Sequence, residues 1–376
     1  MKRNGLQAVV LRNPENVLFA TGYWPITGWT ILALRDDGTN SLLIPRSELD
    51  FLGDAPVDEV IELPMENLDE VQDPYRNFRS FFRSSGIRAG SRVGVELTME
   101  TLATIHTGAE LSFMGRRTLD LLIGETNSSL VDLTGVLMGL RMTKTERELR
   151  KISIACEIAG MGLQEGLSKL REGVSESELA SVIEAAVSSN GIGYKGTRLA
   201  RGFAYVMSGP NGSRAKYPFN VSSNRRMRPG EPVLVELNVQ ADGLWADLTR
   251  TWFIGKPPAE LQRYHDVVRR ANEEAVRQAR AGMSAKELDS VARGVVSSSG
   301  LGASFNHRLG HGIGFRLHEP PTIHPASDEL IARNMVFTIE PGVYGEDYGI
   351  RIEDVVAVWD QESKRLSTFH HDPFMT

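Results

Sequence analysis

Residues 171–193 read REGVSESELASVIEAAVSSNGIG, and residues 280–302 read RAGMSAKELDSVARGVVSSSGLG. The two stretches align without a gap and share 12 identical residues among 23 positions. Each copy opens with a Ser-x-x-Glu capping box, predicting a helix that a later glycine ends. The capping residues are Ser175 with Glu178 and Ser284 with Glu287, and the glycines are Gly191 and Gly300. Short serine-rich helices can resemble one another by chance, but matching caps and stops favour a duplication. A duplicated α/β half predicts two pseudo-symmetric sheets with a cleft between them.

Between the two copies, residues 233–239 read VLVELNV, in which every second residue is apolar. Such alternation predicts a strand that turns Glu236 and Asn238 away from the core. Asp242-Gly243 is a two-residue hairpin signal, which places Asn238 opposite Asp247 and brings Glu236 and Asp247 onto one face. Two neighbouring carboxylates repel each other unless a cation separates them, and no lysine or arginine alternates on this face. The hairpin therefore either binds a cation or carries two ordinary solvent-facing acids.

After the second copy, three of the chain's eight histidines stand close together, because residues 306–321 read NHRLGHGIGFRLHEPP. They are His307, His311 and His318, and the glycines on both sides of His311 let the backbone approach a ligand closely. A single histidine of this kind is usually a buried structural residue. Three of them beside paired glycines favour a functional site.

Two glutamates complete a candidate ligand set. Glu340 ends one predicted strand, and Glu353 shares a face with Arg351 on another, residues 351–355, although either acid alone is an ordinary strand-end residue. The full set is Glu236, Asp247, His311, Glu340 and Glu353. Four carboxylates and one imidazole suit two adjacent divalent ions of the Mn, Co, Fe or Zn kind rather than a thiolate zinc site. Two ions about 3.5–4 Å apart can ionise a shared water and polarise a carbonyl, which is the apparatus of amide hydrolysis.

The composition is that of a soluble globular protein, with 41% hydrophobic and 24% charged residues among 376. A net charge of −6 argues against nucleic acid as a partner. No stretch approaches the roughly 20 apolar residues of a membrane span, and the first residues lack an apolar signal core. The single Cys156 cannot form an internal disulfide and suits a reducing compartment. We expect a cytoplasmic protein with neither a nucleic-acid nor a membrane partner.

Residues up to about 140 alternate β-rich runs with helical patterns, which predicts an α/β domain. Strands are expected at residues 8–11, 30–34, 41–45 and 92–96, and a helix at 75–84. Thr143-x-x-Glu146 fits a capping box that opens a long helix. We place the domain boundary just before it, which gives domains of residues 1–140 and 141–376.

Four ordered motifs carry a resemblance to a known family: ADLTRTW at 246–252, GHGIG at 310–314 with HEPP at 318–321, TIEPGVY at 338–344 and RIEDVV at 351–356. Over most of residues 140–360 the chain resembles the M24 metallopeptidases, which include prolidase, aminopeptidase P, methionine aminopeptidase and the related creatinases. The N-terminal portion resembles the creatinase/prolidase N-domain. The resemblance implies a creatinase-like α/β domain followed by a pseudo-symmetric "pita-bread" catalytic domain.

The resemblance also implies roles for residues at matching positions. Four of them match metal ligands: Asp247, His311, Glu340 and Glu353. Glu340 further matches the general base that acts on the bridging water, and His318 the histidine that hydrogen-bonds the scissile amide. His307 resembles an additional histidine of the proline-specific members, and Arg351 an arginine that supports the bridging carboxylate.

The chain departs from the family's pattern at two places. The first ligand is normally aspartate, whereas position 236 holds glutamate, whose extra methylene moves the carboxylate by roughly 1.5 Å. One ion is therefore expected to bind more weakly or differently. The family also carries a histidine in the segment leading into that strand, where residues 216–220 here read KYPFN. One substrate-contacting group is therefore replaced.

The sequence thus predicts a dinuclear metal-dependent hydrolase of peptide bonds, either an Xaa-Pro dipeptidase or an Xaa-Pro aminopeptidase. His307 favours proline peptides over N-terminal methionine, and the resemblance implies a small peptide or amide substrate and a homodimer. The alternatives are a creatinase-like C–N hydrolase or lyase on the same fold, and a binding protein that has lost catalysis. The pair His370-His371 is interpreted as exposed and without a role.

Overall fold

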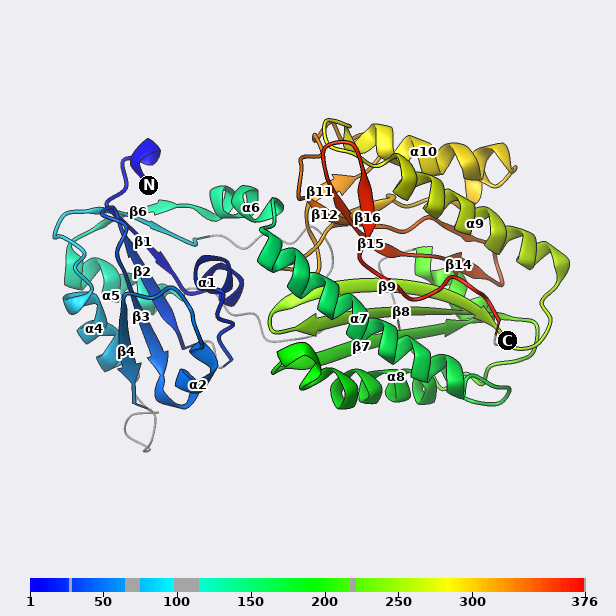
Figure 1. Cartoon of the computed structure of the whole chain (residues 1–376), viewed down its shortest axis with the longest axis horizontal. Coiled ribbons are helices and arrows are strands. Elements are labelled where there is room, and N and C mark those ends of the chain that lie inside the picture. The colour runs from blue at the N-terminus through cyan, green and yellow to red at the C-terminus, as the bar shows by residue number, and fades with distance from the viewer. Residues whose placement is uncertain (27–28, 65–74, 98–114, 217–220, 375–376) are drawn as a thin grey trace. The chain divides into compact units, whose positions relative to one another are not determined.

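The computed structural model describes residues 1–26, 29–64, 75–97, 115–216 and 221–374, which form two compact units (Figure 1). Among the described residues, those up to Arg141 form one unit and those from Met142 onward form the other. Within the described ranges, no helix combines the length and the apolar character needed to cross a bilayer.

The first unit is a six-stranded sheet of order β4-β3-β2-β1-β5-β6, in which β1 pairs antiparallel with β2 and parallel with β5. Its strands are β1 (Ala8–Leu11), β2 (Ile31–Arg35), β3 (Asn40–Pro45), β4 (Glu59–Leu63), β5 (Arg92–Val95) and β6 (Ser129–Asp132). Its α-helices are α1 (Pro14–Thr21), α2 (Leu49–Leu52), α4 (Tyr75–Ser84), α5 (Arg116–Thr126) and α6 (Thr134–Met142). The four predicted strands and the predicted helix are confirmed to within one residue at each end.

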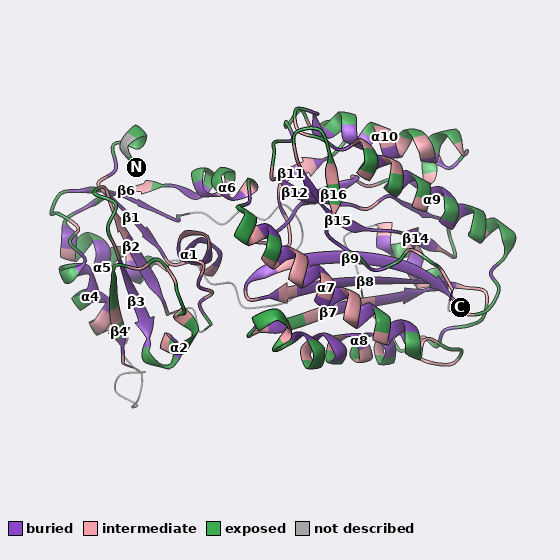
Figure 2. Cartoon of the chain, viewed as in Figure 1, coloured by how far each residue is buried: buried purple, intermediate pink, exposed green. Residues whose placement is uncertain are grey.

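Both faces of this sheet are covered by helices. Alternate residues of β1 belong to two separate apolar clusters, one containing Phe78 of α4 and the other containing Val17 of α1 and Leu137 of α6. Successive residues of a strand point to opposite faces, so a strand buried on both sides is apolar throughout. This explains the uninterrupted run of apolar residues in β1, and Figure 2 shows the strand buried along its length.

The second unit contains two helix-and-sheet halves. The first half consists of α7 (Glu146–Lys169), α8 (Glu176–Gly191), β7 (Ala200–Ser208), β8 (Pro232–Ala241) and β9 (Leu244–Phe253), with sheet order β7-β8-β9. The second half has α9 (Ala259–Gln278), α10 (Ala285–Ser298), β10 (Gly310–Gly312), β11 (Glu319–Ile323), β12 (Val336–Ile339), β15 (Asp354–Val358) and β16 (Ser363–Arg365), with sheet order β11-β10-β12-β15-β16. A separate hairpin joins β13 (Gly342–Tyr344) to β14 (Gly349–Arg351). Short 3-10 helices cover Lys2–Asn4, Arg46–Glu48, Tyr194–Gly196, Gly209–Lys216 and Gly302–Ser304.

The repeated segments occupy equivalent places in the two halves. Both predicted capping boxes are present, and both N-cap serines form isolated β-bridges, Ser175 with Arg226 and Ser284 with Leu330. As predicted, α8 ends at Gly191, and α10 ends two residues before Gly300. A Cβ at Gly191 would lie 2.7 Å from the Ile158 side chain, so close packing explains the glycine.

The start of α7 differs from the prediction by two residues. The capping box consists of Thr145 and Glu148, not Thr143 and Glu146. Thr143 instead forms a β-bridge with Met335 in the second half. Both threonines are followed by a glutamate three residues later. The β-bridge to Met335 places Thr143 outside the helix, so Thr145 caps it.

The β8–β9 hairpin has the predicted register, with Asn238 opposite Asp247 and Glu236 opposite Thr249. The turn residues Asp242 and Gly243 have φ angles of 45° and 85°, as a two-residue hairpin turn with left-handed residues requires. The two halves meet at this hairpin, because Glu353 forms a β-bridge with Thr249 and donates its N–H to the Thr249 carbonyl at 3.0 Å. This junction brings strands from both halves to one place.

Candidate metal centre

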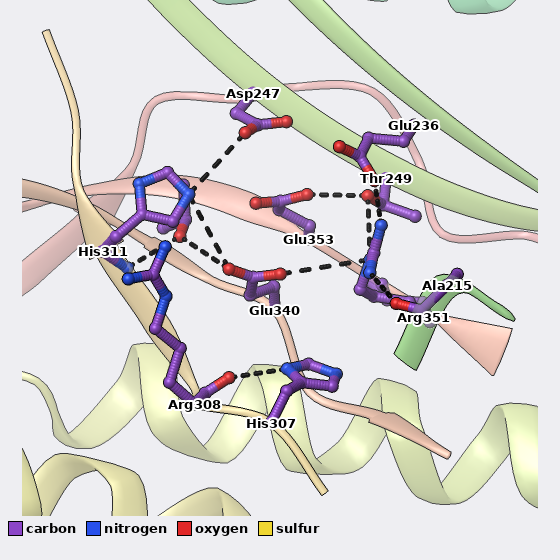
Figure 3. Close-up of polar contacts among 12 residues, drawn as sticks. Ala215, Glu236, Asp247, Thr249, His307, Arg308, His311, Glu340, Arg351 and Glu353 are labelled. Atoms are coloured by element: carbon purple, nitrogen blue, oxygen red, sulfur yellow. Dashed lines mark hydrogen bonds and ion pairs between the residues drawn. The ribbon is translucent and has the colours of Figure 1, made fainter. Parts of the chain in front are cut away.

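Acidic residues and histidines converge where the two halves of the second unit meet (Figure 3). Two groups of side chains, which share His311, each hold ligand atoms within 4.8 Å of one another. The first group is Asp247, His311 and His318, and the second is His311, Glu340 and Glu353. Asp247 comes from β9 and His311 from β10, while Glu340 follows β12 and Glu353 precedes β15. The structure therefore brings together four of the five predicted ligands, drawn from both halves of the repeat.

His311 presents one ring nitrogen to the acids. Its Nδ1 lies 3.0 Å from the Gly312 carbonyl oxygen and donates to it, which leaves the Nε2 lone pair facing the carboxylates. Nε2 is 3.7 Å from Asp247 Oδ2 and 3.7 Å from Glu340 Oε1. These separations are too long for direct hydrogen bonds. An imidazole held in this tautomer is arranged as metal-ligating histidines are.

The glycines beside His311 allow neighbouring backbones to pack closely. A Cβ at Gly310 would lie 1.9 Å from the Thr338 carbonyl oxygen, and one at Gly312 would lie 2.1 Å from the Pro320 carbonyl oxygen. Only glycine allows the neighbouring segments to close on β10 at both points. This closure fixes the direction of the His311 side chain.

The crowded acids are strongly perturbed. Burial raises the pKa values of Asp247 and Glu353 well above their usual range, and the neighbouring carboxylates add to the effect. Burial also raises the pKa of Glu340 to about 7, and it lowers the pKa of His311 well below its usual value. A divalent cation would offset the repulsion among the acids and would favour a neutral imidazole. Hard oxygen donors with one imidazole are the ligands that such a cation prefers, so the residues fit a metal.

Glu353 is held by residues that the sequence did not single out. Thr249 Oγ1 donates to Glu353 Oε2 at 2.6 Å. The Arg250 guanidinium donates to the Glu353 carbonyl at 2.6 Å, and also to the carbonyls of Phe369 and His370 at 2.6 and 2.9 Å. The backbone and the carboxylate of this candidate ligand are thus both fixed. Thr249 could have been predicted from the sequence, because it lies two residues beyond Asp247 and therefore on the same face of the strand.

The prediction that His371 is exposed is wrong, although His370 is exposed as expected. His371 Nε2 donates to Asp354 Oδ2 at 2.8 Å, and its side chain is only 8% exposed. Asp354 is fully buried and also pairs with Arg250 at 2.9 Å. A buried carboxylate requires such partners, so the C-terminal segment is drawn into the fold.

Glu236 is placed differently from the other predicted ligands, although its charge helps to raise the pKa values of the other three acids. Among the described residues, it belongs to neither group of converging ligand atoms. Its carboxylate pairs with the Arg351 guanidinium, and Figure 3 shows both beside Thr249. Arg351 was predicted to support a bridging carboxylate. Besides Glu236, its guanidinium lies 4.0 Å from Glu340 Oε2 and donates to Thr249 Oγ1 at 3.3 Å. The predicted strand 351–355 is also interrupted, because β14 ends at Arg351 and β15 begins at Asp354.

The two other predicted histidines differ in position. The ring of His318 lies 4.1 Å from that of His311, close to the candidate ligands. His307 belongs to neither ligand group of the described residues, and its Nε2 accepts from the Tyr344 hydroxyl at 2.9 Å. Burial lowers the pKa of His307 to about 3, so the ring is neutral. Tyr344 also accepts from Arg351 at 3.3 Å, and it was missed although it closes the TIEPGVY motif.

A buried ion pair supports the segment that carries His318. Lys144 Nζ donates to Glu319 Oε1 at 2.5 Å, and the two side chains are 0% and 3% exposed. Because Glu319 directly follows His318, this pair anchors the backbone at one side of the histidine.

Comparison with known proteins identifies the family. Residues 150–360 match the model of metallopeptidase family M24, and residues 1–143 match that of the creatinase/prolidase N-terminal domain. The chain belongs to family M24. Members of M24 are metal-dependent, and the converging acids and histidines are the candidate metal site of this one. The family and the fold class predicted from the sequence are confirmed.

Similar M24 proteins cover almost the whole chain. An Xaa-Pro dipeptidase from Pyrococcus horikoshii is 28% identical over 368 residues, which is 98% of this chain and 94% of that protein. The crystal structure of the prolidase from the same organism superposes with a TM-score of 0.78 at 26% identity, covering 100% of this chain and 97% of that one. The X-Pro aminopeptidase from Thermotoga maritima superposes with a TM-score of 0.79 at 26% identity, covering 99% of both chains.

Proposed function

We propose that this M24 protein is a metal-dependent peptidase that cleaves the bond before proline, as an Xaa-Pro dipeptidase or an Xaa-Pro aminopeptidase. The observation that carries the proposal is the convergence of Asp247, His311, Glu340 and Glu353 at one buried place. Proline specificity is supported by the names of the similar proteins, which are Xaa-Pro dipeptidase and X-Pro aminopeptidase. The substrate is therefore a small peptide with proline in second position.

The ligand set is proposed to hold two divalent ions of the Mn, Co, Fe or Zn kind. Its members are Glu236, Asp247, His311, Glu340 and Glu353. Such ions, when bound, polarise the substrate carbonyl and lower the pKa of a bound water to about 7. The carboxylates neutralise the charge of the ions. The five side chains also hold their ligand atoms in fixed directions at a largely buried site.

Glu340 is the proposed general base. Its side chain is 13% exposed, so the carboxylate is largely buried yet reachable by a water molecule. The carboxylate takes a proton from the attacking water as the water oxygen bonds to the carbonyl carbon. The same proton then passes to the proline nitrogen as the C–N bond breaks, which balances the hydrolysis and restores Glu340.

The remaining predicted residues position the substrate or the acids. His318, beside His311, is proposed to hydrogen-bond the scissile amide. His307 is neutral and accepts from Tyr344, so we assign it to the wall that contacts the proline side of the substrate. Arg351 fixes Glu236 and, through Thr249, Glu353.

The test is a peptide panel on protein stripped with a chelator and reloaded with Mn, Co, Fe or Zn. We expect cleavage of Xaa-Pro dipeptides or of Xaa-Pro-Xaa tripeptides, with the matching Xaa-Ala peptides as controls. The Glu340→Gln variant should lose cleavage even at saturating metal, because an amide cannot accept the proton of the attacking water. Metal-loaded protein that cleaves none of the Xaa-Pro peptides would exclude this function.

We also propose that the protein works in the cytoplasm as a homodimer. The single Cys156 is a buried, free thiol, which suits a reducing compartment. Light scattering on a size-exclusion column measures the mass in solution, and a mass of 41.5 kDa, that of one chain, would exclude the dimer.

A further inference from the structure

The helix α10 carries an ion pair that is directed at the backbone of its own half. Asp289 and Arg293 lie one turn apart, and the guanidinium donates to both carboxylate oxygens, from Nε at 2.7 Å and from Nη2 at 2.9 Å. The Asp289 side chain is 1% exposed and that of Arg293 is 26% exposed. A carboxylate bonded twice by a planar guanidinium holds it in one orientation. The remaining donors of Arg293 therefore have fixed directions.

The first half of the unit lacks this pair. In the gapless alignment of the repeats, Ala180 and Glu184 of α8 correspond to Asp289 and Arg293 of α10. Glu184 accepts the N–H of Ala204 in β7 at 2.9 Å, so each helix bonds the backbone of its own half from this position. The second copy differs in having a guanidinium there, which can bind carbonyl oxygens.

The remaining donors of Arg293 hold the segment that precedes β10. Its Nη1 donates to the Phe305 carbonyl at 2.8 Å, and its Nη2 donates to the His307 carbonyl at 3.0 Å. The central carbon of the guanidinium also lies 4.2 Å from the centre of the Phe305 ring. That ring packs edge-on against the His307 imidazole, with 5.1 Å between the ring centres. Arg293 thus fixes both the backbone of His307 and the aromatic ring beside it.

The contacts of the His307 imidazole depend on this backbone position. Its Nδ1 donates to the Arg308 carbonyl at 2.7 Å, and its Nε2 accepts from the Tyr344 hydroxyl at 2.9 Å. Hydrogen bonds weaken steeply when their distance or angle departs from the optimum. A shift of the backbone at residue 307 would therefore loosen the ring.

Asp289 holds the same segment at a second point. Its Oδ1 accepts the Leu309 N–H at 3.1 Å, and this N–H is shared with the Ile323 carbonyl at 2.9 Å. The Leu309 carbonyl in turn accepts the N–H of Glu340 at 2.8 Å. One ion pair thus reaches the backbone of His307 through its guanidinium and that of the proposed base Glu340 through its carboxylate.

We propose that Arg293 is a positioning residue, which sets His307 in the wall on the proline side of the substrate. The inference rests on the proposed peptidase function and deepens it, because it names the group that holds His307 in register with Glu340. Arg293 acts through the carbonyls of Phe305 and His307. A lysine at this position keeps the charge beside Asp289, but its single ammonium cannot bond two carbonyls and a carboxylate in one plane.

The first test is steady-state kinetics of metal-saturated Arg293→Lys on the Xaa-Pro peptide that the unchanged protein cleaves best. KM should rise by roughly 10- to 100-fold, because a displaced contact on the proline side weakens binding. The value of kcat should stay within about threefold, since the bonds from Asp289 to Leu309 and from Leu309 to Glu340 remain. A merely structural role would lower the amount of folded enzyme, and therefore kcat, without changing KM.

Two further variants complete this test. Arg225→Lys is the matched control, because Arg225 is 21% exposed, pairs with Glu231 at 2.7 Å and donates to the Ser208 hydroxyl at 2.7 Å. Its KM should equal that of the unchanged protein. Asp289→Asn combined with Arg293→Met removes the buried charge together with its partner, so no unpaired charge remains. This double variant should raise KM at least as much as Arg293→Lys.

The second test needs no substrate and uses ¹⁵N NMR of the histidine rings in metal-free protein at neutral pH. The Nδ1–H signal of His307 is assigned by its loss in His307→Gln. This signal should shift or broaden in Arg293→Lys and stay in place in Arg225→Lys.

An unchanged KM or an unchanged His307 signal in Arg293→Lys overturns the proposal, and so does an equal rise of KM in Arg225→Lys. The two readouts separate this proposal from the peptidase function. A shifted signal in a protein that cleaves no Xaa-Pro peptide refutes the peptidase function and leaves Arg293 as the residue that positions His307. An unmoved signal in an active peptidase refutes the positioning role alone.

Discussion

Replacing Thr249 by valine removes one hydroxyl from behind the candidate metal site with little change in shape. This hydroxyl donates to Glu353 at 2.6 Å, accepts from Arg351 at 3.3 Å and is fully buried. A bound ion requires Glu353 in its ionised form. In the metal-free protein, burial raises the pKa of that carboxyl well above its usual value. The bond to the ionised carboxylate therefore stabilises mainly the metal-bound state.

The size of the effect follows from this bond. A hydrogen bond to a charged group contributes about 1.5–3 kcal/mol. This corresponds to roughly 10- to 100-fold in affinity for the ion that Glu353 binds. Thr249→Ser keeps the hydroxyl and should recover most of the loss. The assay is calorimetric titration of the metal-free variants with Mn²⁺ or Co²⁺.

A matched control lies two residues along the same strand. Thr251 is 1% exposed, and its hydroxyl bonds only the Arg351 backbone among the described residues, at 3.0 Å in each case. Thr251→Val should therefore lower the free energy of unfolding by about 1–3 kcal/mol and leave the affinity for the ion bound by Glu353 unchanged. The reasoning is refuted if Thr249→Val binds the ion as tightly as the unchanged protein, or if both valine variants lose the same affinity.

Three further outcomes are expected. Glu353→Gln or His311→Ala should abolish metal-dependent cleavage and tight metal binding while circular dichroism stays native, and activity that persists in either variant after chelation would contradict the site. In metal-free protein, the pKa of Glu340 is raised from 4.5 to about 7, so its contribution to stability is complete below pH 4.5 and is lost as the pH rises through 7. Thermal melts in the presence of a chelator should show that the Glu340→Gln variant lacks this pH dependence. Equal dependence of the melting temperature on pH in the variant and the unchanged protein would contradict the raised pKa of Glu340. Lys144→Met leaves the Glu319 carboxylate buried without its cation and should cost about 3–5 kcal/mol in urea unfolding, whereas adding Glu319→Gln should restore most of it.

The part of the site on the β8–β9 hairpin could be predicted from short-range sequence patterns. Asp242-Gly243 specifies its own turn, and the turn sets the pairing of every residue in β8 and β9. The shared face of Glu236 and Asp247 could therefore be predicted from two residues of turn chemistry. The repeat likewise predicted both helix caps, because a capping box is complete within four residues.

Long-range contacts account for what the sequence did not predict. Arg351 and Glu353 were expected on one strand, but Glu353 leaves the hairpin to bridge Thr249, a residue 104 positions earlier. The ion pair of Glu236 with Arg351 and the burial of His371 also depend on partners from distant segments. Alternation and spacing within a segment carry no information about such partners. The residue types of the site and the pairing within its hairpin were predictable, whereas the pairings between distant segments were not.

The hydrogen bonds of Arg250 constrain the order in which the parts of this protein can fold during its synthesis. Its guanidinium joins the Glu353 carbonyl to the carbonyls of residues that lie 119 and 120 positions after Arg250. During synthesis, β8 and β9 emerge long before these acceptors exist, and domains generally fold from the N-terminal side first. The first unit can fold while the ribosome is still translating. The metal centre is completed only after Phe369 and His370 have been added, so a stalled or shortened product would carry a folded first unit and an unfinished site.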